Sequence, residues 1–264
     1  MRIDLRWGGD DTNRIRALAQ ELVGLQPDII VTEGTPATAT LQRETRTIPN
    51  VFAGVGDPVA SGIVPRFDRP GGNVTGFASY EASMGGKWLE LLSEIALGLK
   101  RAAIMFNPDI NLVSLYFMPS FEMAARSLNV GAITAPVHDD VEIEAAIIAL
   151  AREPGGGLVV VPDIFMVVHR APIILAAAQN QVPAFYSYSA FARDGGLLSY
   201  GVDRVDTFRR AASYVDRILR GAKPGDLPVQ FPTKFEMVVN RKAATALGLA
   251  IPPSIMLRAD EVIE

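Results

Sequence analysis

Three polar residues stand directly after apolar runs, where a parallel sheet presents side chains to a ligand. They are Asp57, Asn107 and Asp163. The carboxyl ends of parallel strands meet at one edge of a sheet, and a carboxylate at that edge can pair with an amino group. Two alternatives stay open, because Asp57 precedes a proline and suits a turn, and Asp163 suits a helix N-cap.

A second candidate lies in the sequence Glu33-Gly34-Thr35-Pro36-Ala37, between a short apolar run and a helical pattern. The unpaired amides at a helix start, together with the helix dipole, favour a carboxylate there. We therefore predict that Thr35, Pro36 and Ala37 bind an anionic group. The alternative is that Thr35 only caps the helix, since Thr-Pro starts many helices.

Aromatic residues follow the last predicted strand of the second half of the chain. Tyr186, Tyr188 and Phe191 are close in sequence, and Tyr200 comes shortly before Asp203. Aromatic rings offer apolar area with a polar tip, which suits a flat side chain or a cation. We predict that Tyr186, Tyr188, Tyr200 and Asp203 line the binding site, with packing in the core as the alternative for Tyr186.

The composition and motifs argue against several kinds of chemistry. There is no cysteine, and the two histidines, His138 and His169, stand apart in no metal-binding motif, so we interpret both as surface or structural residues. No Walker lysine, dinucleotide fingerprint or nucleophile elbow occurs. The net charge of −4 disfavours nucleic acid, and no apolar run is long enough to insert into a membrane. The sequence therefore predicts a binding protein with no metal, cofactor or catalytic set.

The elements that would position these residues alternate between strands and helices. A parallel sheet covered on both faces follows from this alternation. Strands are predicted at residues 2–7, 29–31, 51–55, 101–106, 131–137, 157–161, 182–186, 197–202 and 235–239, with an irregular Gly/Pro-rich passage at 57–76.

The fold class is therefore α/β, with two doubly wound lobes and a hinge. We place residues 1–80 and 203–222 in the N-terminal lobe, and residues 81–202 and 223–264 in the C-terminal lobe. A ligand would lie in the cleft between the lobes, and the lobes would close on it.

Several blocks of sequence, in a fixed order over essentially the whole chain, resemble one family. The first is TIPNVFAGVGDPVASGIVPRFDRPGGNVTGF at residues 47–77. It is followed by GGKWLELLSEIA, FNPD, PVHDDVEIEAAI, GGLLSYGVD, YVDRILRGAKPGDLPVQFPTKFEMVVNRKAATALGL and RADEVIE. Together they are similar to the ABC transporter substrate-binding protein family linked to tryptophan and tyrosine uptake.

This resemblance implies a type I periplasmic-binding-protein fold, a periplasmic location, a small-molecule solute and an ABC permease as partner. It suggests an aromatic or related amino acid as the ligand. The alternatives are a sensory or regulatory binding protein on the same fold, an enzyme acting on a sugar or nucleotide, and a chain that binds nothing.

The resemblance also implies a truncated N-terminal lobe. Family members normally carry an export signal, a first strand and a helix before the RIDLRW segment with which this chain begins. Without that strand, we expect the edges of residues 2–7 and 29–31 to lack a pairing partner.

Overall fold

The computed structural model describes residues 2–109 and 113–264, and the chain divides into two compact units. Unit 1 comprises Met1–Glu81 and Asp203–Lys234, and unit 2 comprises Ala82–Val202 and Phe235–Glu264. The chain therefore passes between the units after Glu81, after Val202 and after Lys234.

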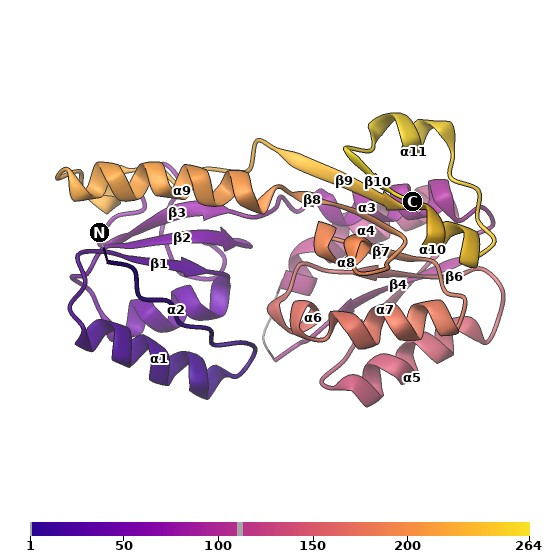
Figure 1. The fold of residues 1–264 in the computed structure, drawn as a ribbon, viewed down its shortest axis with the longest axis horizontal. Helices are drawn as coiled ribbons and strands as arrows, with labels where there is room; N and C mark the ends of the chain where they lie inside the picture. The colour runs from indigo at the N-terminus through magenta and orange to yellow at the C-terminus, as the bar shows by residue number, and fades with distance from the viewer. Residues whose placement is uncertain (1, 110–112) are drawn as a thin grey trace. The chain divides into compact units, whose positions relative to one another are not determined.

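Unit 1 is a parallel three-stranded sheet with helices on both faces (Figure 1). Its strands lie in the order β1-β2-β3. Its elements are α1 (Thr12–Gly24), β1 (Ile30–Glu33), α2 (Thr35–Glu44), β2 (Asn50–Val55), β3 (Val74–Ala78), α9 (Arg204–Leu219) and the 3-10 turn Pro224–Asp226.

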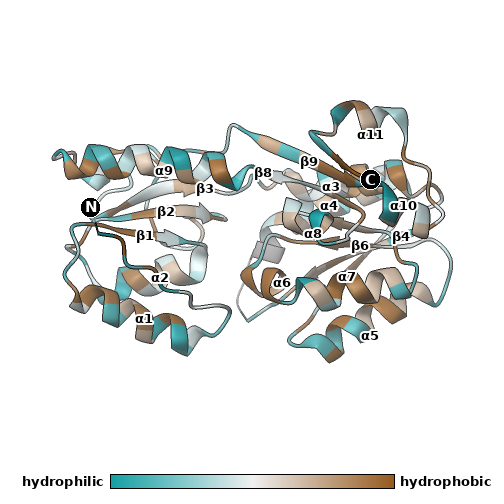
Figure 2. Ribbon diagram, viewed as in Figure 1, coloured by the Kyte–Doolittle hydropathy of each residue, from teal (hydrophilic) through white to brown (hydrophobic). Residues whose placement is uncertain are grey.

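Apolar side chains bury both faces of this sheet. Leu41 of α2 packs with Ile30 of β1 on one face, and Tyr214 of α9 packs with Val51 and Phe77 on the other. Figure 2 shows hydrophilic and hydrophobic residues mixed along α9, as expected of a helix with one face on a sheet.

The predicted strand at residues 2–7 is wrong. These residues form no strand, and Ile3, Leu5 and Trp7 are exposed. Their alternation is typical of a strand, but a strand needs a hydrogen-bonded neighbour, and β1 has only β2 among the described residues.

The irregular passage predicted at 57–76 contains the start of a strand that sequence reasoning missed. Residues Val74–Ala78 form β3, which pairs in parallel with β2. A Cβ atom at Gly76 would lie 2.1 Å from the carbonyl oxygen of Phe52, so glycine here allows the two strands to approach. The glycine that suggested a loop is therefore part of the sheet.

The segment 223–234 belongs to unit 1, whereas the sequence placed it in the other lobe. Its residues bond to β3 and to the passage before it: Val229 N donates to Phe67 O at 2.8 Å, and the hydroxyl of Thr75 donates to Leu227 O at 2.6 Å. The crossing into unit 2 comes only after Lys234.

Unit 2 contains a seven-stranded sheet in the order β10-β9-β8-β7-β6-β4-β5, parallel except for the β8–β9 pair (Figure 1). Its strands are β4 (Arg101–Phe106), β5 (Gly131–Pro136), β6 (Gly156–Val160), β7 (Ala184–Tyr186), β8 (Leu198–Val202), β9 (Phe235–Asn240) and β10 (Glu261–Ile263). Its helices are α3 (Met84–Ile95), α4 (Val113–Leu128), α5 (Asp140–Ala151), α6 (Ile164–Val168), α7 (Arg170–Gln179), α8 (Ser189–Arg193), α10 (Arg241–Ala246) and α11 (Pro253–Arg258).

The predicted strands of this half of the chain are confirmed. Most of their ends lie within one or two residues of the ends in the structure. The core on the α5 and α7 side consists of aliphatic and aromatic residues, among them Met105, Ile147, Phe165 and Ile173. These near-continuous apolar strands are typical of a parallel sheet buried on both faces.

The strand order reverses at β4. The chain goes from β4 to β5 on one side and returns to β6 on the other side of β4. In open α/β sheets, the crevice at such a reversal is where ligands bind, outside the carboxyl ends of the strands.

Candidate functional site

Asn107 and Asp163 lie together at this reversal. Each follows the end of a strand that flanks it, β4 for Asn107 and β6 for Asp163. The backbone amide of Asn107 donates to Oδ2 of Asp163 at 3.3 Å, and the amide of Phe165 donates to Oδ1 at 2.6 Å. The two residues are only 4% and 3% exposed. A buried carboxylate held by two backbone amides is thus placed at the crevice that the topology predicts.

Asp163 takes the N-cap position that the sequence left as an alternative, since it caps the short helix α6. This position does not remove it from the site. An ionised carboxylate has about four acceptor sites, so accepting a backbone amide on each oxygen does not by itself prevent contact with a ligand. Its ligand role stays a prediction.

The aromatic residues after β7 differ in where their rings lie. Tyr186 is 1% exposed, and its ring stacks on Phe191 with centroids 4.9 Å apart. It therefore packs in the core, which was the alternative for this residue, and its predicted contact with ligand stays a prediction. Burial also raises the pKa of its hydroxyl. Tyr188 is half-buried at the margin of the same core, and its ligand role stays a prediction.

Ser187 was missed by sequence reasoning. It comes directly after β7 and is buried, so it occupies the same position on its strand as Asn107 does on β4. The rule that selected Asp57 and Asn107, a polar residue directly after an apolar run, would also have selected Ser187.

In unit 1, helix α2 begins at Thr35 with Pro36 in its first turn. The N-cap position is held by Gly34, which has a φ of 78° and provides no side-chain hydrogen bond to the helix. Thr35 is thus not the cap. Residues Thr35, Pro36 and Ala37 are half-buried, and their predicted contact with an anionic group stays a prediction.

Asp57 performs the turn role that the sequence left open. Its Oδ1 accepts the amides of Val59 at 3.0 Å and Ala60 at 2.9 Å. Such an Asx turn explains why aspartate follows β2.

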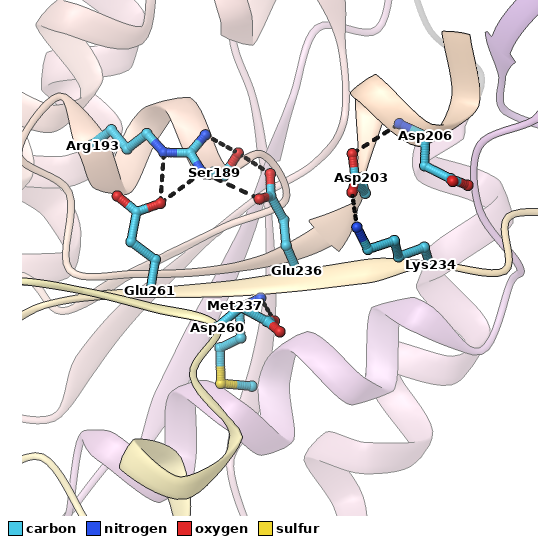
Figure 3. Close-up of polar contacts among 9 residues, drawn as sticks. All are labelled: Ser189, Arg193, Asp203, Asp206, Lys234, Glu236, Met237, Asp260 and Glu261. Atoms are coloured by element: carbon cyan, nitrogen blue, oxygen red, sulfur yellow. Dashed lines mark hydrogen bonds and ion pairs between the residues drawn. The ribbon is translucent and has the colours of Figure 1, made fainter. Parts of the chain in front are cut away.

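Tyr200 and Asp203 lie beside the second crossing of the chain. Asp203 caps α9 through the amide of Asp206 at 2.9 Å and pairs with Lys234 at 2.8 Å (Figure 3). The hydrogen bond from Lys234 holds the pKa of Asp203 below its ordinary value. Tyr200 stacks on Phe235, with centroids 5.6 Å apart. Both are engaged in local structure, and their contact with ligand stays a prediction.

A polar network fixes the helix that follows Tyr188. Arg193 of α8 pairs with Glu261 at 2.7 Å and with Glu236 at 3.2 Å, and the hydroxyl of Ser189 donates to Glu236 (Figure 3). These contacts attach α8 to β9 and β10. They fix the end of the loop formed by Ser187 and Tyr188.

Two kinds of function lack support in the described part of the chain. No group of three or more histidine, cysteine, aspartate or glutamate residues there could hold a metal ion. No helix there is long and apolar enough to cross a bilayer.

A family model described as ABC transporter substrate binding protein matches residues 2–263. This chain belongs to the ABC transporter substrate-binding protein family. It is 26% identical over 251 residues to a tyrosine-binding protein of Clostridioides difficile, covering 94% of this chain and 71% of that one.

Two solved structures are similar throughout. One is a conserved domain protein from Vibrio cholerae, with 28% identity and a TM-score of 0.87, covering 96% of this chain and 84% of that one. The other is an ABC domain from Streptococcus pneumoniae in complex with L-Trp, with 25% identity, a TM-score of 0.87 and the same coverage.

Membership of this family establishes the broad functional class of the chain. Its members are extracytoplasmic, non-enzymatic components of ABC transporters that bind small molecules, with a two-sheet α/β fold. The predicted family, fold class and lack of enzymatic activity are therefore confirmed.

Proposed function

We propose that this protein binds an aromatic amino acid for import by an ABC permease, and that it does so in the periplasm. The observation that carries the proposal is the buried Asn107–Asp163 pair at the strand reversal of unit 2. A carboxylate held there attracts an ammonium group, because a charge-assisted hydrogen bond is strong where water is largely excluded.

The choice of amino acid is supported by the relatives. One is described as binding tyrosine and another was solved with L-Trp, and both match nearly all of this chain. In this proposal Asp163 binds the ammonium group, Asn107 supplies a polar contact beside it, and Tyr188 contacts the ring. The α2 amides at Thr35 and Ala37 are assigned to the carboxylate.

Isothermal titration calorimetry with L-tyrosine, L-tryptophan, L-phenylalanine and L-leucine tests the proposal. We expect binding of at least one aromatic amino acid, weaker binding of L-leucine, and no binding of tyramine, which lacks the carboxylate. Absence of binding by every amino acid would overturn the assignment.

The role assigned to the Asn107 side chain is tested with Asn107→Ala, which keeps the backbone amide that donates to Asp163. We expect binding to weaken about tenfold or more, since removing one partner of a buried polar contact costs about 1–3 kcal/mol. Asn180→Ala is the matched control, because Asn180 is the C-cap residue of α7 and its side-chain amide donates to the carbonyl oxygen of Ala176 at 2.8 Å. Equal affinity of both variants for L-tyrosine would remove Asn107 from the site.

A further inference from the structure

The chain has two histidines, and both contact the first turn of α5. Nδ1 of His138 lies 2.8 Å from Oε2 of Glu142, and Nδ1 of His169 lies 2.5 Å from Oδ1 of Asp140. Two residues far apart in sequence are thus paired with carboxylates of one helix. Histidine is the side chain whose ordinary pKa lies nearest to neutral pH.

His138 connects α5 to the loop that carries Asn107. Its Nε2 lies 3.7 Å from Oδ2 of Asp109, while its Nδ1 contacts Glu142. The backbone amide of Asp109 donates to Oδ1 of Asn107 at 2.9 Å. One ion pair and one hydrogen bond therefore separate this histidine from the proposed binding residue.

His169 is linked to the other member of the pair, Asp163, through Phe165. Its ring stacks on Phe165, with centroids 4.0 Å apart and an interplanar angle of 26°. The amide of Phe165 donates to Asp163, whose other oxygen accepts the amide of Asn107. These contacts link two positions at the start of α5 to the pair. Asp140 is linked through His169 and Phe165 to Asp163, and Glu142 is linked through His138 and Asp109 to Asn107.

The protonation state of His138 decides whether it keeps both of its carboxylate contacts. An imidazolium has N–H groups on both nitrogens, so it can face Glu142 and Asp109 at once. A neutral imidazole keeps one N–H, and the lone pair of its other nitrogen would then face a carboxylate. Deprotonation therefore weakens at least one of the two contacts.

The surroundings of His138 favour its charged form. His138 faces Asp109 from the loop after β4, together with Asp139 and Glu142 from the start of α5, and the hydrogen bond to Glu142 raises its pKa. His169 faces Asp140 of α5, and Arg170 beside it is bonded to Asp194.

We propose that His138 couples the geometry of the Asn107–Asp163 site to pH, fixing the loop that carries Asn107 against α5 when it is protonated. The effect on solute affinity rests on the proposed function, whereas the coupling itself does not. A histidine whose pKa is raised in the folded state gives its full contribution below its ordinary pKa of about 6.5. That contribution is lost as the pH rises above this value through the raised pKa of His138. A loop that is no longer fixed keeps Asn107 in the binding geometry for a smaller fraction of the time, so we expect solute binding to be tighter in acid.

The coupling is measured first without any ligand, by NMR titration of the full chain from about pH 5.5 to about pH 8, the range in which histidine changes charge. We expect the backbone amide signal of Asn107 to shift with the midpoint of the His138 imidazole. In His138→Gln this shift is lost, whereas the control variant His169→Gln keeps it. A wild-type Asn107 amide signal that does not follow the His138 imidazole would overturn the proposal.

The second measurement is the affinity for L-tyrosine over the same pH range. We expect wild-type affinity to fall about two- to tenfold from acid to alkali, as partly exposed ion pairs allow, and His138→Gln to reduce this dependence. Glu142→Gln should reduce it too. Glu144→Gln, which changes an exposed acid on the same helix, should leave it intact.

The two measurements separate the possible failures. If wild-type protein binds no amino acid at any pH but the Asn107 amide signal follows His138, the coupling stands and the proposed ligand is wrong. If L-tyrosine binds with the same affinity across the range, His138 does not control the site.

Discussion

At the scale of single residues, Asp163 contributes to the stability of the fold and belongs to the proposed binding site. Its two oxygens accept amides from two different segments, at Asn107 and Phe165, and the side chain is buried. Asp163→Asn keeps the size of the side chain but replaces one acceptor oxygen with an NH2 donor that would face a backbone N–H. We expect a loss of about 1–3 kcal/mol in the free energy of unfolding, which is a fall in Tm of roughly 2–12 °C by calorimetry.

The control for this prediction is Asp57→Asn. Asp57 also accepts two backbone amides, but it lies in a half-buried turn where water can replace a lost bond. We expect Asp57→Asn to lower the free energy of unfolding by less than about 1 kcal/mol. Equal losses for the two variants would show that the burial of Asp163 has no energetic consequence.

The residues of the candidate site were only partly predictable from the sequence. Asn107 and Asp163 were found because a polar residue after an apolar run marks the end of a buried strand. For Tyr186 the sequence left core packing and ligand contact both open, because the face to which a strand residue points depends on its neighbours, here Phe191 and the close approach of Gly196. The role of the histidines depends on contacts between residues distant in sequence, which periodicity does not reveal.

At the scale of elements, the strands with continuous apolar runs were predicted well and the others were not. β4 and β6 are buried on both faces, so composition alone indicates them. β3 was missed because Gly76 suggests a loop until the approach of Phe52 is known. Residues 2–7 show the opposite error, a strand that was predicted but does not form. Their apolar and polar residues alternate as in a strand, but alternation does not supply a hydrogen-bonded neighbour.

The state of residues 2–7 is tested through the two tryptophans of the chain. Trp7 is 73% exposed and Trp88 of α3 is 0% exposed. We expect iodide to quench part of the tryptophan fluorescence, and Trp7→Phe to remove that part and leave a blue-shifted emission. Trp88→Phe, the matched variant, should leave a red-shifted emission that iodide quenches fully.

Protection of Trp7 from iodide would contradict the exposed state. Its side chain would then pack against something in solution. Repeating the measurement at several protein concentrations distinguishes packing within one molecule from packing between two, because only the second depends on concentration.

At the scale of the whole molecule, the question is whether both units respond to the same solute. A ligand shifts a conformational equilibrium only by the difference between its affinities for the two states. A solute that contacts unit 1 and unit 2 together therefore changes the distances between them, and one held by unit 2 alone does not. The absence of native cysteine allows spin labels to be placed at single sites.

We expect L-tyrosine to shift and narrow the distance distribution between labels at Arg14→Cys in α1 and Glu144→Cys in α5, measured by electron double resonance. Both positions are exposed and lie in different units. Moving a population from about 1:99 to 99:1 needs a roughly 10⁴-fold difference in affinity, so a partial shift is the reasonable expectation. In the Asn107→Ala background the same shift should require more ligand. If calorimetry shows binding while the distribution stays unchanged, the solute is held by one unit, and the predicted role of Thr35 and Ala37 is wrong.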